Sequence, residues 1–146
     1  MSILTIERIK LNGTATSKED AIQQAGDLLV NSGAVAKEYV AGMHEREATM
    51  STYLGNGVAI PHGMHESIQY IKQSAVSVLQ LPNGVEWEDG EMAYLVIGIA
   101  ATSDEHIGIL SNLAEVVEEE EDVEALANTD DAEFILNQLN QEPQPE

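Results

Sequence analysis

The 146-residue chain contains no cysteine and few basic side chains, and these shortages exclude several classes of protein. Without cysteine there can be no disulfide framework, no thiolate zinc site and no cysteine nucleophile. Six Lys and Arg stand against 26 Asp and Glu, a formal net charge of −20. Because that charge repels nucleic-acid phosphates and anionic lipids, we expect no nucleic-acid partner and no direct membrane insertion. A basic protein is the more plausible partner.

A long hydrophobic run is also missing. The longest apolar stretch, Tyr94 to Ala101, is far shorter than the ~20 residues of a membrane-spanning helix. Glu7, Arg8 and Lys10 interrupt the apolar N-terminal segment, which therefore differs from a signal peptide. We expect a cytoplasmic protein.

Apolar residues at helical spacing predict four helices. Thr16 to Glu19 has the spacing of a capping box, in which a hydroxyl and a glutamate each satisfy a backbone N–H group of the other. Gly33 supplies a left-handed stop, so the first helix should cover about residues 17–32. The other predicted helices cover about residues 38–46, 107–117 and 134–139.

Three short apolar segments predict strands at residues 58–60, 75–81 and 94–101. Gly55 to Gly57 and Pro82 to Gly84 are turn signals. The third strand is apolar throughout, so we expect it in the centre of the sheet with both faces covered. Helices, then strands, then helices predict an α/β fold (an α+β sandwich), in which helices flank a mixed β-sheet.

No internal repeat or second domain is visible, and we expect one domain over residues 1–140. The tail at residues 141–146 has no core residue and should be frayed. Many of the acids lie between Glu115 and Glu133. This stretch is typical of a solvated helix face or of adaptation to salt, and it could also steer a basic partner.

Among four histidines, His62 has the most distinctive setting. It follows a predicted strand end, Pro61 stiffens the approach, and Gly63 leaves room for a ligand or a partner's backbone. A neutral imidazole has a lone pair near physiological pH and can act as a nucleophile. The alternative is a turn histidine without a function.

His106 and Arg46 are two further candidates for chemistry. His106 follows the apolar strand in the first turn of a predicted helix, where ligands gather and backbone N–H groups attract anions. It could instead be a solvated histidine at a helix start. The planar fork of Arg46 suits a phosphoryl group; the alternative is a surface ion pair with Glu45 or Glu47, which would contribute little.

A metal site is a less favoured interpretation of the same region. His62 and His65 have a His-x-x-His spacing, and His106 and Glu66 could complete a zinc site. The nearby acids are ordinary for this composition. Bound zinc that survives dialysis would support this interpretation.

Five segments in a fixed order resemble those of a known family: Glu45 to Glu47, Tyr53 to Gly55, Val58 to Gly63, Leu95 to Ala101 and Glu105 to Ile107. From about Ile9 to Leu139 their order and spacing resemble the mannitol-type enzyme IIA of the bacterial phosphoenolpyruvate-dependent sugar phosphotransferase system. Pro-His-Gly alone is a weak signal, whereas the ordered set is specific. The fold of that family, a mixed sheet flanked by helices, is similar to the one predicted above.

The resemblance implies that His62 is phosphorylated by the phosphocarrier protein HPr and passes the phosphoryl group to a cysteine of an enzyme IIB domain. This transfer would serve the uptake and phosphorylation of mannitol or a related sugar. The resemblance also implies that His106 is the second active-site histidine and Arg46 the active-site arginine, with no metal or cofactor. Met64 and His65 depart from the family pattern, so His65 could act as a competing donor or acceptor.

A second function is compatible with the same site. Phosphorylation adds about −1.5 to −2 charge, so it could act as a switch in a regulatory binding module that is not itself part of transport. A genomic neighbour that encodes a permease would favour transport, and a nitrogen-metabolism operon would favour the switch.

Overall fold

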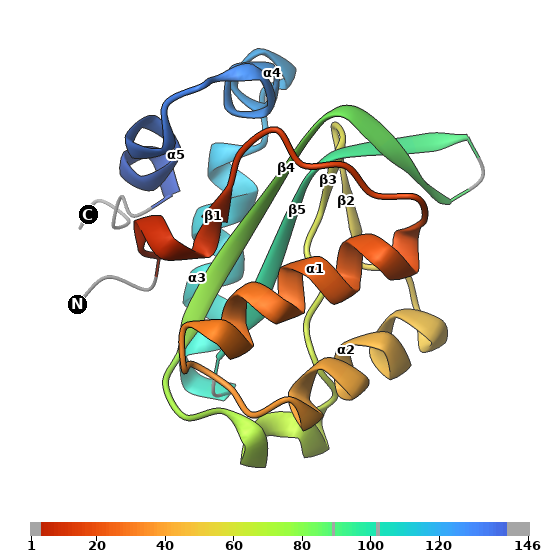
Figure 1. Cartoon of the computed structure of the whole chain (residues 1–146), viewed down its shortest axis with the longest axis vertical. Helices are drawn as coiled ribbons and strands as arrows, with labels where there is room; N and C mark the ends of the chain where they lie inside the picture. Colours follow the sequence, from red (N-terminus) through yellow and green to blue (C-terminus); the bar gives the residue numbers. More distant parts are fainter. Residues whose placement is uncertain (1–3, 89, 102, 140–146) are drawn as a thin grey trace.

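Five strands form one mixed sheet between two layers of helices in the computed structural model (Figure 1). The structure describes residues 4–88, 90–101 and 103–139, with the backbone alone at residues 103–107, 109 and 110. The strands are β1 (Ile9–Lys10), β2 (Tyr53–Gly55), β3 (Val58–Ala59), β4 (Ala75–Glu88) and β5 (Glu91–Ala100). Their order across the sheet is β1-β4-β5-β3-β2.

Strand β5 lies between β4 and β3, which confirms the prediction that the apolar strand is central. It pairs antiparallel with β4 and parallel with β3, while β1 joins β4 in parallel and β2 joins β3 antiparallel. The sheet is therefore mixed, as predicted. Gly55 to Gly57 form the predicted turn between β2 and β3, where Asn56 and Gly57 have φ values of 52° and 83°.

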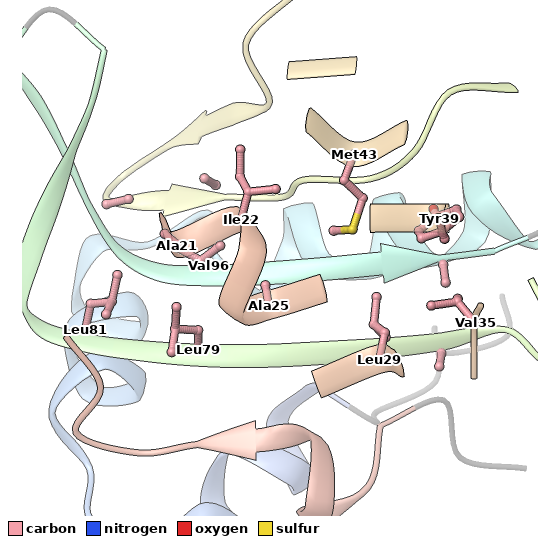
Figure 2. Close-up of a cluster of buried hydrophobic side chains, with 14 of the residues drawn as sticks. Ala21, Ile22, Ala25, Leu29, Val35, Tyr39, Met43, Leu79, Leu81 and Val96 are labelled. Atoms are coloured by element: carbon pink, nitrogen blue, oxygen red, sulfur yellow. The ribbon is translucent and has the colours of Figure 1, made fainter. Parts of the chain in front are cut away.

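Side chains of β5 alternate between two hydrophobic cores, because successive residues of a strand point to opposite faces. Ile97 and Ile99 contact the helices α3 (Ser103–Val116), α4 (Glu120–Asn128) and α5 (Ala132–Leu139). Val96 and Ala100 contact α1 (Lys18–Asn31) and α2 (Glu38–Thr49) on the other face (Figure 2). The predicted sandwich is thus confirmed. Two 3-10 helices, Ile6–Arg8 and His65–Tyr70, complete the elements.

The helix cap was predicted one residue too early. Helix α1 begins after Ser17, whose hydroxyl accepts a hydrogen bond from Asp20 N–H at 3.1 Å. The Asp20 carboxylate in turn accepts from Thr16 N–H at 3.0 Å. Thr16 with Glu19 and Ser17 with Asp20 have the same spacing, so the sequence pattern alone did not distinguish the two registers.

The predicted turn at Pro82 to Gly84 is wrong. Strand β4 continues to Glu88, and a register shift between Gln80 and Val85 accommodates the turn-like residues as a bulge. Proline is tolerated at a bulge because it has no N–H to donate to the ladder. The chain reverses between Glu88 and Glu91, which are paired across the hairpin.

The acidic stretch after α3 contains a separate helix, α4, that the sequence analysis did not predict. Val123 and Leu126 are buried against the sheet, while Glu120, Glu121 and Glu124 are exposed, so the expected solvated face is present.

Helix α2 also extends beyond its predicted end. Residues 141–146, predicted to be a frayed tail, lie outside the described residues. None of the helices in the described part of the chain is long and apolar enough to span a membrane.

Replacing Gln80 should weaken the attachment of α4 to the sheet. The buried amide of Gln80 donates to Leu126 C=O at 2.9 Å and to Thr129 C=O at 2.8 Å, and it accepts from Asn12 N–H at 2.9 Å. Gln80→Leu leaves these groups unpaired and should lower the free energy of unfolding by about 2 to 3 kcal/mol. Urea unfolding measures this loss.

The matched control is Gln69→Leu, because Gln69 is exposed and bonds only locally, to Glu66 C=O. Its effect should stay within about 0.5 kcal/mol. Equal losses in the two variants would contradict the role assigned to Gln80.

Candidate functional site

His62 lies directly beyond the carboxyl end of β3, where the chain is still paired with β5. Ile99 N–H donates to Pro61 C=O at 2.9 Å, and His62 forms a parallel bridge with Ile99. This bridge continues the β3 and β5 ladder past the end of the short strand. His62 is therefore positioned by the sheet, at the edge where the parallel strands β3 and β5 both end.

The imidazole of His62 has a defined tautomer. Its Nδ1 lies 2.8 Å from Ile60 C=O. Because a carbonyl oxygen can only accept, Nδ1 carries a proton, and in the neutral imidazole the lone pair is then on Nε2. The ring is partly buried, so one side reaches the protein surface. Nε2 is the atom that can act as a nucleophile.

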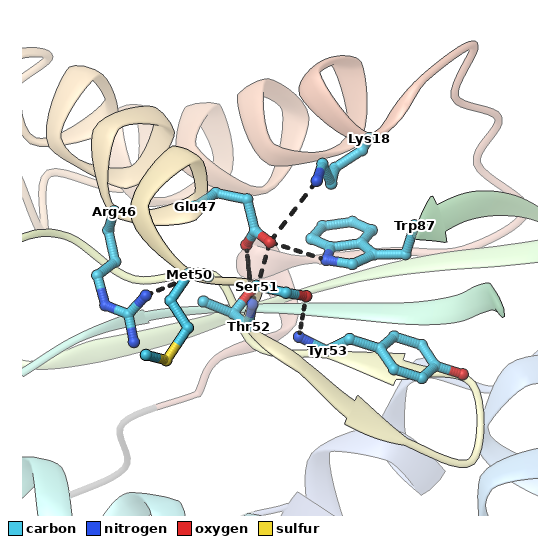
Figure 3. Close-up of polar contacts among 8 residues, drawn as sticks. All are labelled: Lys18, Arg46, Glu47, Met50, Ser51, Thr52, Tyr53 and Trp87. Carbon is cyan, nitrogen blue, oxygen red and sulfur yellow. Dashed lines mark hydrogen bonds and ion pairs between the residues drawn. The ribbon is translucent and has the colours of Figure 1, made fainter. Parts of the chain in front are cut away.

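Arg46 lies in the last turn of α2. Its Nη1 donates to Met50 C=O at 2.7 Å, which holds the guanidinium over the helix end (Figure 3). This bond uses one of five N–H groups of the guanidinium. Arg46 therefore has the planar donor arrangement that a phosphoryl group requires.

Glu47 is not the surface partner of Arg46 that the sequence analysis considered. It is 5% exposed, and its carboxylate accepts from Thr52 N–H at 3.0 Å, from the Thr52 hydroxyl and from Trp87 Nε1 at 3.2 Å. Lys18 Nζ lies 3.9 Å from the same carboxylate. Figure 3 shows Arg46 and Glu47 pointing away from each other. Glu47 thus ties the end of α2 to β4 and fixes the turn that carries Arg46.

A cleft of about 720 Å³ brings the candidate residues together. Its lining includes Tyr39, Arg46, Met50, His62, His65 and Ile99. Two of the three predicted site residues, His62 and Arg46, therefore share one concave surface. His106 is in the first turn of α3, which begins three residues after β5 ends at Ala100. Its side chain lies outside the described side chains, so its predicted role stays a prediction.

Tyr39 is part of this site, although nothing in the sequence singles it out as a site residue. Its hydroxyl accepts from Gly63 N–H at 2.9 Å and donates to Ile99 C=O at 2.7 Å. Burial raises its pKa from 10.0 to about 12, partly offset by the hydrogen bond from Gly63. The hydroxyl of Tyr39 bonds to a loop 24 residues away, and no pattern in the sequence around Tyr39 indicates this contact.

The absence of a side chain at Gly63 has a structural reason that the sequence did not indicate. A Cβ at this position would lie 2.7 Å from a ring carbon of Tyr39 and 2.9 Å from Ser67 Cβ. Glycine is required here because the tyrosine ring fills the space that a side chain would need. Gly63 also lines the cleft, and the expected close approach of a ligand or a partner's backbone stays a prediction.

The arrangement gives little support to a metal site. His65 and Glu66 are exposed at the start of a 3-10 helix, and His65 lines the same cleft as His62. Within the part of the chain whose side chains are described, no three histidine or acidic residues are grouped closely enough to hold an ion. An imidazole and a guanidinium that line one cleft suit the transfer of an anionic group.

Sequence comparisons agree with the geometry. The family model for "Phosphoenolpyruvate-dependent sugar phosphotransferase system, EIIA 2" matches residues 2–142. The chain is 44% identical over 143 residues to the mannitol-specific phosphotransferase enzyme IIA component of Bacillus subtilis, covering 96% of this chain and 100% of that protein. It is 48% identical over 136 residues to the multiphosphoryl transfer protein of Rhodobacter capsulatus, covering 93% of this chain but only 16% of that longer protein.

Solved structures share the fold along most of the chain. The crystal structure of IIA mannitol from Escherichia coli has a TM-score of 0.86 at 39% identity and covers 92% of this chain and 97% of its own. The E. coli complex of enzyme IIA mannitol with phosphorylated enzyme IIB mannitol has a TM-score of 0.86 at 38% identity, covering 91% and 94%. The nitrogen regulatory protein IIA-Ntr of Neisseria meningitidis has a TM-score of 0.80 at 29% identity, covering 94% and 96%.

The raised pKa of Tyr39 predicts a loss of stability in alkali. With a pKa of about 12 instead of 10.0, the folded state holds the phenol proton more tightly than the unfolded chain. The contribution of Tyr39 to the free energy of unfolding is fully present below pH 10 and is lost as the pH rises to about 12, a change of about 2 to 3 kcal/mol. Urea unfolding at a series of pH values should show a smaller decline for Tyr39→Phe. An identical decline in both proteins would contradict the assignment.

Proposed function

Since this chain belongs to the EIIA 2 family of the phosphoenolpyruvate-dependent sugar phosphotransferase system, we propose that His62 carries the phosphoryl group, with Arg46 as the residue that binds its oxygens. The family members are phosphotransferases that work through a phosphohistidine. The observation that supports His62 best is its Nδ1–H bond to Ile60 C=O, because in the neutral ring this bond puts the lone pair on Nε2, and His62 lines the cleft.

The proposed reaction has two balanced steps. Nε2 of His62 attacks the phosphorus of a phosphohistidine on HPr, an N–P bond forms, and the N–P bond to the donor imidazole breaks. A cysteine thiolate of an enzyme IIB domain then attacks the same phosphorus, and the bond to Nε2 breaks as the S–P bond forms. The proton stays on Nδ1 throughout and remains hydrogen-bonded to the Ile60 carbonyl oxygen. No oxidant, metal or water takes part.

Arg46 has a defined contribution to this reaction. In phosphoryl transfer, charge is spread over three equatorial oxygens, and catalysis depends mainly on positioning and electrostatic stabilisation. A guanidinium can donate to two of these oxygens at once. Because α2 and the Glu47 contacts hold Arg46 in place, little reorganisation is needed when the phosphoryl group arrives.

We place His106 as the second histidine of this site. The support is its position: the start of α3 lies at the same edge of the sheet as His62, after the parallel neighbour of β3. The backbone N–H groups of a helix start favour an anion at this point.

The proposed donor is HPr and the proposed acceptor is an enzyme IIB domain. The E. coli relative was solved in complex with phosphorylated enzyme IIB mannitol, which supports this acceptor. A net charge of −20 suits a basic donor, since opposite charges accelerate encounter. We propose a cytoplasmic protein, because its donor is phosphorylated from phosphoenolpyruvate, and one functional domain over residues 1–140.

Mannitol or a related sugar is the proposed substrate that is taken up and phosphorylated. The Bacillus subtilis relative is mannitol-specific by name and is 44% identical, whereas the nitrogen regulatory relative is 29% identical. This difference favours transport over a purely regulatory module.

Phosphorylation of His62 can be tested by intact-mass spectrometry. After incubation with phosphoenolpyruvate, enzyme I and HPr at alkaline pH, the protein should gain the mass of one phosphoryl group, and His62→Ala should gain none. His44→Gln is the matched control, because His44 does not line the cleft and bonds to Gln23, and this variant should be labelled like the unaltered protein. Labelling of His62→Ala with the fully active carriers would place the phosphoryl group elsewhere.

The role of Arg46 can be tested by the rate of phosphoryl transfer from phosphorylated HPr. Arg46→Ala should slow the transfer about a hundred-fold, because a preorganised donor to the phosphoryl oxygens is lost. Arg46→Lys should recover part of the rate, since it keeps the charge without the planar fork.

Lys10→Ala is the charge-matched control for Arg46. Lys10 lies on β1, at the opposite edge of the sheet from β2, and bonds to the half-buried side chain of Gln24. Its removal should change the rate by less than about two-fold, because salt screens distant charges. Equal slowing by Arg46→Ala and Lys10→Ala would contradict a specific role of Arg46, because the loss of one positive charge anywhere would then explain the effect.

A further inference from the structure

The backbone on the two sides of His62 is held by two different kinds of bond. Before His62, Ile99 N–H donates directly to Pro61 C=O. After His62, Gly63 N–H donates to the Tyr39 hydroxyl, which donates in turn to Ile99 C=O. In a parallel bridge, Gly63 N–H and Ile99 C=O would be the groups that complete the pairing. The phenol hydroxyl therefore bonds to both of these groups, next to the bridge between His62 and Ile99.

Tyr39 also connects this bridge to the helix that carries Arg46. Both residues are on α2, Tyr39 in the first turn and Arg46 in the last, seven residues apart. Residues at this spacing lie on the same face of a helix, and both line the cleft. One phenol thus fixes the relative placement of the element that bears the arginine and the loop that bears the histidine.

We propose that Tyr39 is a positioning residue for phosphoryl transfer, an inference that rests on the proposed role of His62. Its hydroxyl sets the orientation of the Pro61 to Gly63 backbone and thereby the direction of Nε2. Small errors in the placement of reacting groups can reduce a rate by about a hundred-fold.

The hydroxyl can do this only while it is protonated, since it must donate to Ile99 C=O. Its raised pKa of about 12 is consistent with this requirement. Tyr39 is 3% exposed, and the Gly63 backbone packs directly against its ring, so water cannot easily replace the hydroxyl. Phenylalanine at this position would leave Gly63 N–H and Ile99 C=O without their shared partner.

The chain provides a matched control in Tyr53. The Tyr53 hydroxyl accepts from Gly57 N–H at 3.0 Å and donates to Met92 C=O at 3.1 Å. Like Tyr39, it links a glycine N–H to a carbonyl of β5, but near the beginning of that strand instead of its end. Tyr53→Phe therefore removes the same pair of bonds away from His62.

The experiment measures transfer from phosphorylated HPr at several HPr concentrations, for the unaltered chain, Tyr39→Phe and Tyr53→Phe. Tyr39→Phe should lower the maximal rate about ten-fold or more, with the KM for HPr changed by less than about two-fold, because the buried hydroxyl does not touch the donor protein. Tyr53→Phe should keep both values within about two-fold.

A second measurement reports the position of the ring itself. Nitrogen NMR shifts of His62 in the unphosphorylated protein should show a proton on Nδ1, and Tyr39→Phe should redistribute it between the two nitrogens. Tyr53→Phe should leave the shifts unchanged. This readout is taken on folded protein, as judged by the amide spectrum. If Tyr39→Phe does not fold, Gly63→Ala, which must displace the Tyr39 ring, replaces it and should show the same changes.

The outcomes separate the two proposals. A normal maximal rate and normal His62 shifts in Tyr39→Phe would overturn the role of Tyr39 while leaving His62 as the acceptor. Equal slowing by both tyrosine variants would also overturn it, because the effect would then reflect a general loss of stability. Failure to label His62 in the unaltered chain, with active carriers, would instead overturn the proposed function.

Discussion

The parallel pairing of β3 with β5 is the constraint on which the site depends. Strand β3 has two residues, yet its pairing extends through the bond from Ile99 N–H to Pro61 C=O and so reaches His62. Because β5 is buried in the centre of the sheet, it provides a rigid reference for a residue that must stay accessible. His62 thus follows the end of β3 in the chain, but its backbone is held by the sheet.

Arg46 is held by an independent set of contacts. The Glu47 carboxylate binds the chain after α2 and the indole of Trp87, so a buried charge with several donors fixes the helix end. Such a carboxylate is stable inside the protein because its oxygens are hydrogen-bonded. The site therefore combines a histidine fixed by backbone pairing with an arginine fixed by side-chain contacts, and Tyr39 is the connection between them.

Much of this arrangement could be predicted from local patterns, and the failures have physical causes. The apolar run of β5 and the Pro61 to Gly63 turn predicted a central strand and a histidine at a strand end, since both are properties of neighbouring residues. Pro82 to Gly84 satisfied the rules for a turn, but pairing with β5 absorbed it as a bulge. The bonds of Tyr39 join residues 24 and 60 positions apart, and no local pattern encodes them.

The long β4 and β5 hairpin has a consequence for the order of folding. It is formed by strands adjacent in the chain and supplies the centre of the sheet, so its closure costs little loop entropy. The pairing of Ile9 with Val78 and of His62 with Ile99 spans much longer separations. We expect the hairpin to belong to the folding nucleus and the His62 loop to dock onto it late. The reactive segment would then also be the first to open in native-state hydrogen exchange, so local unfolding would inactivate the protein before global unfolding does.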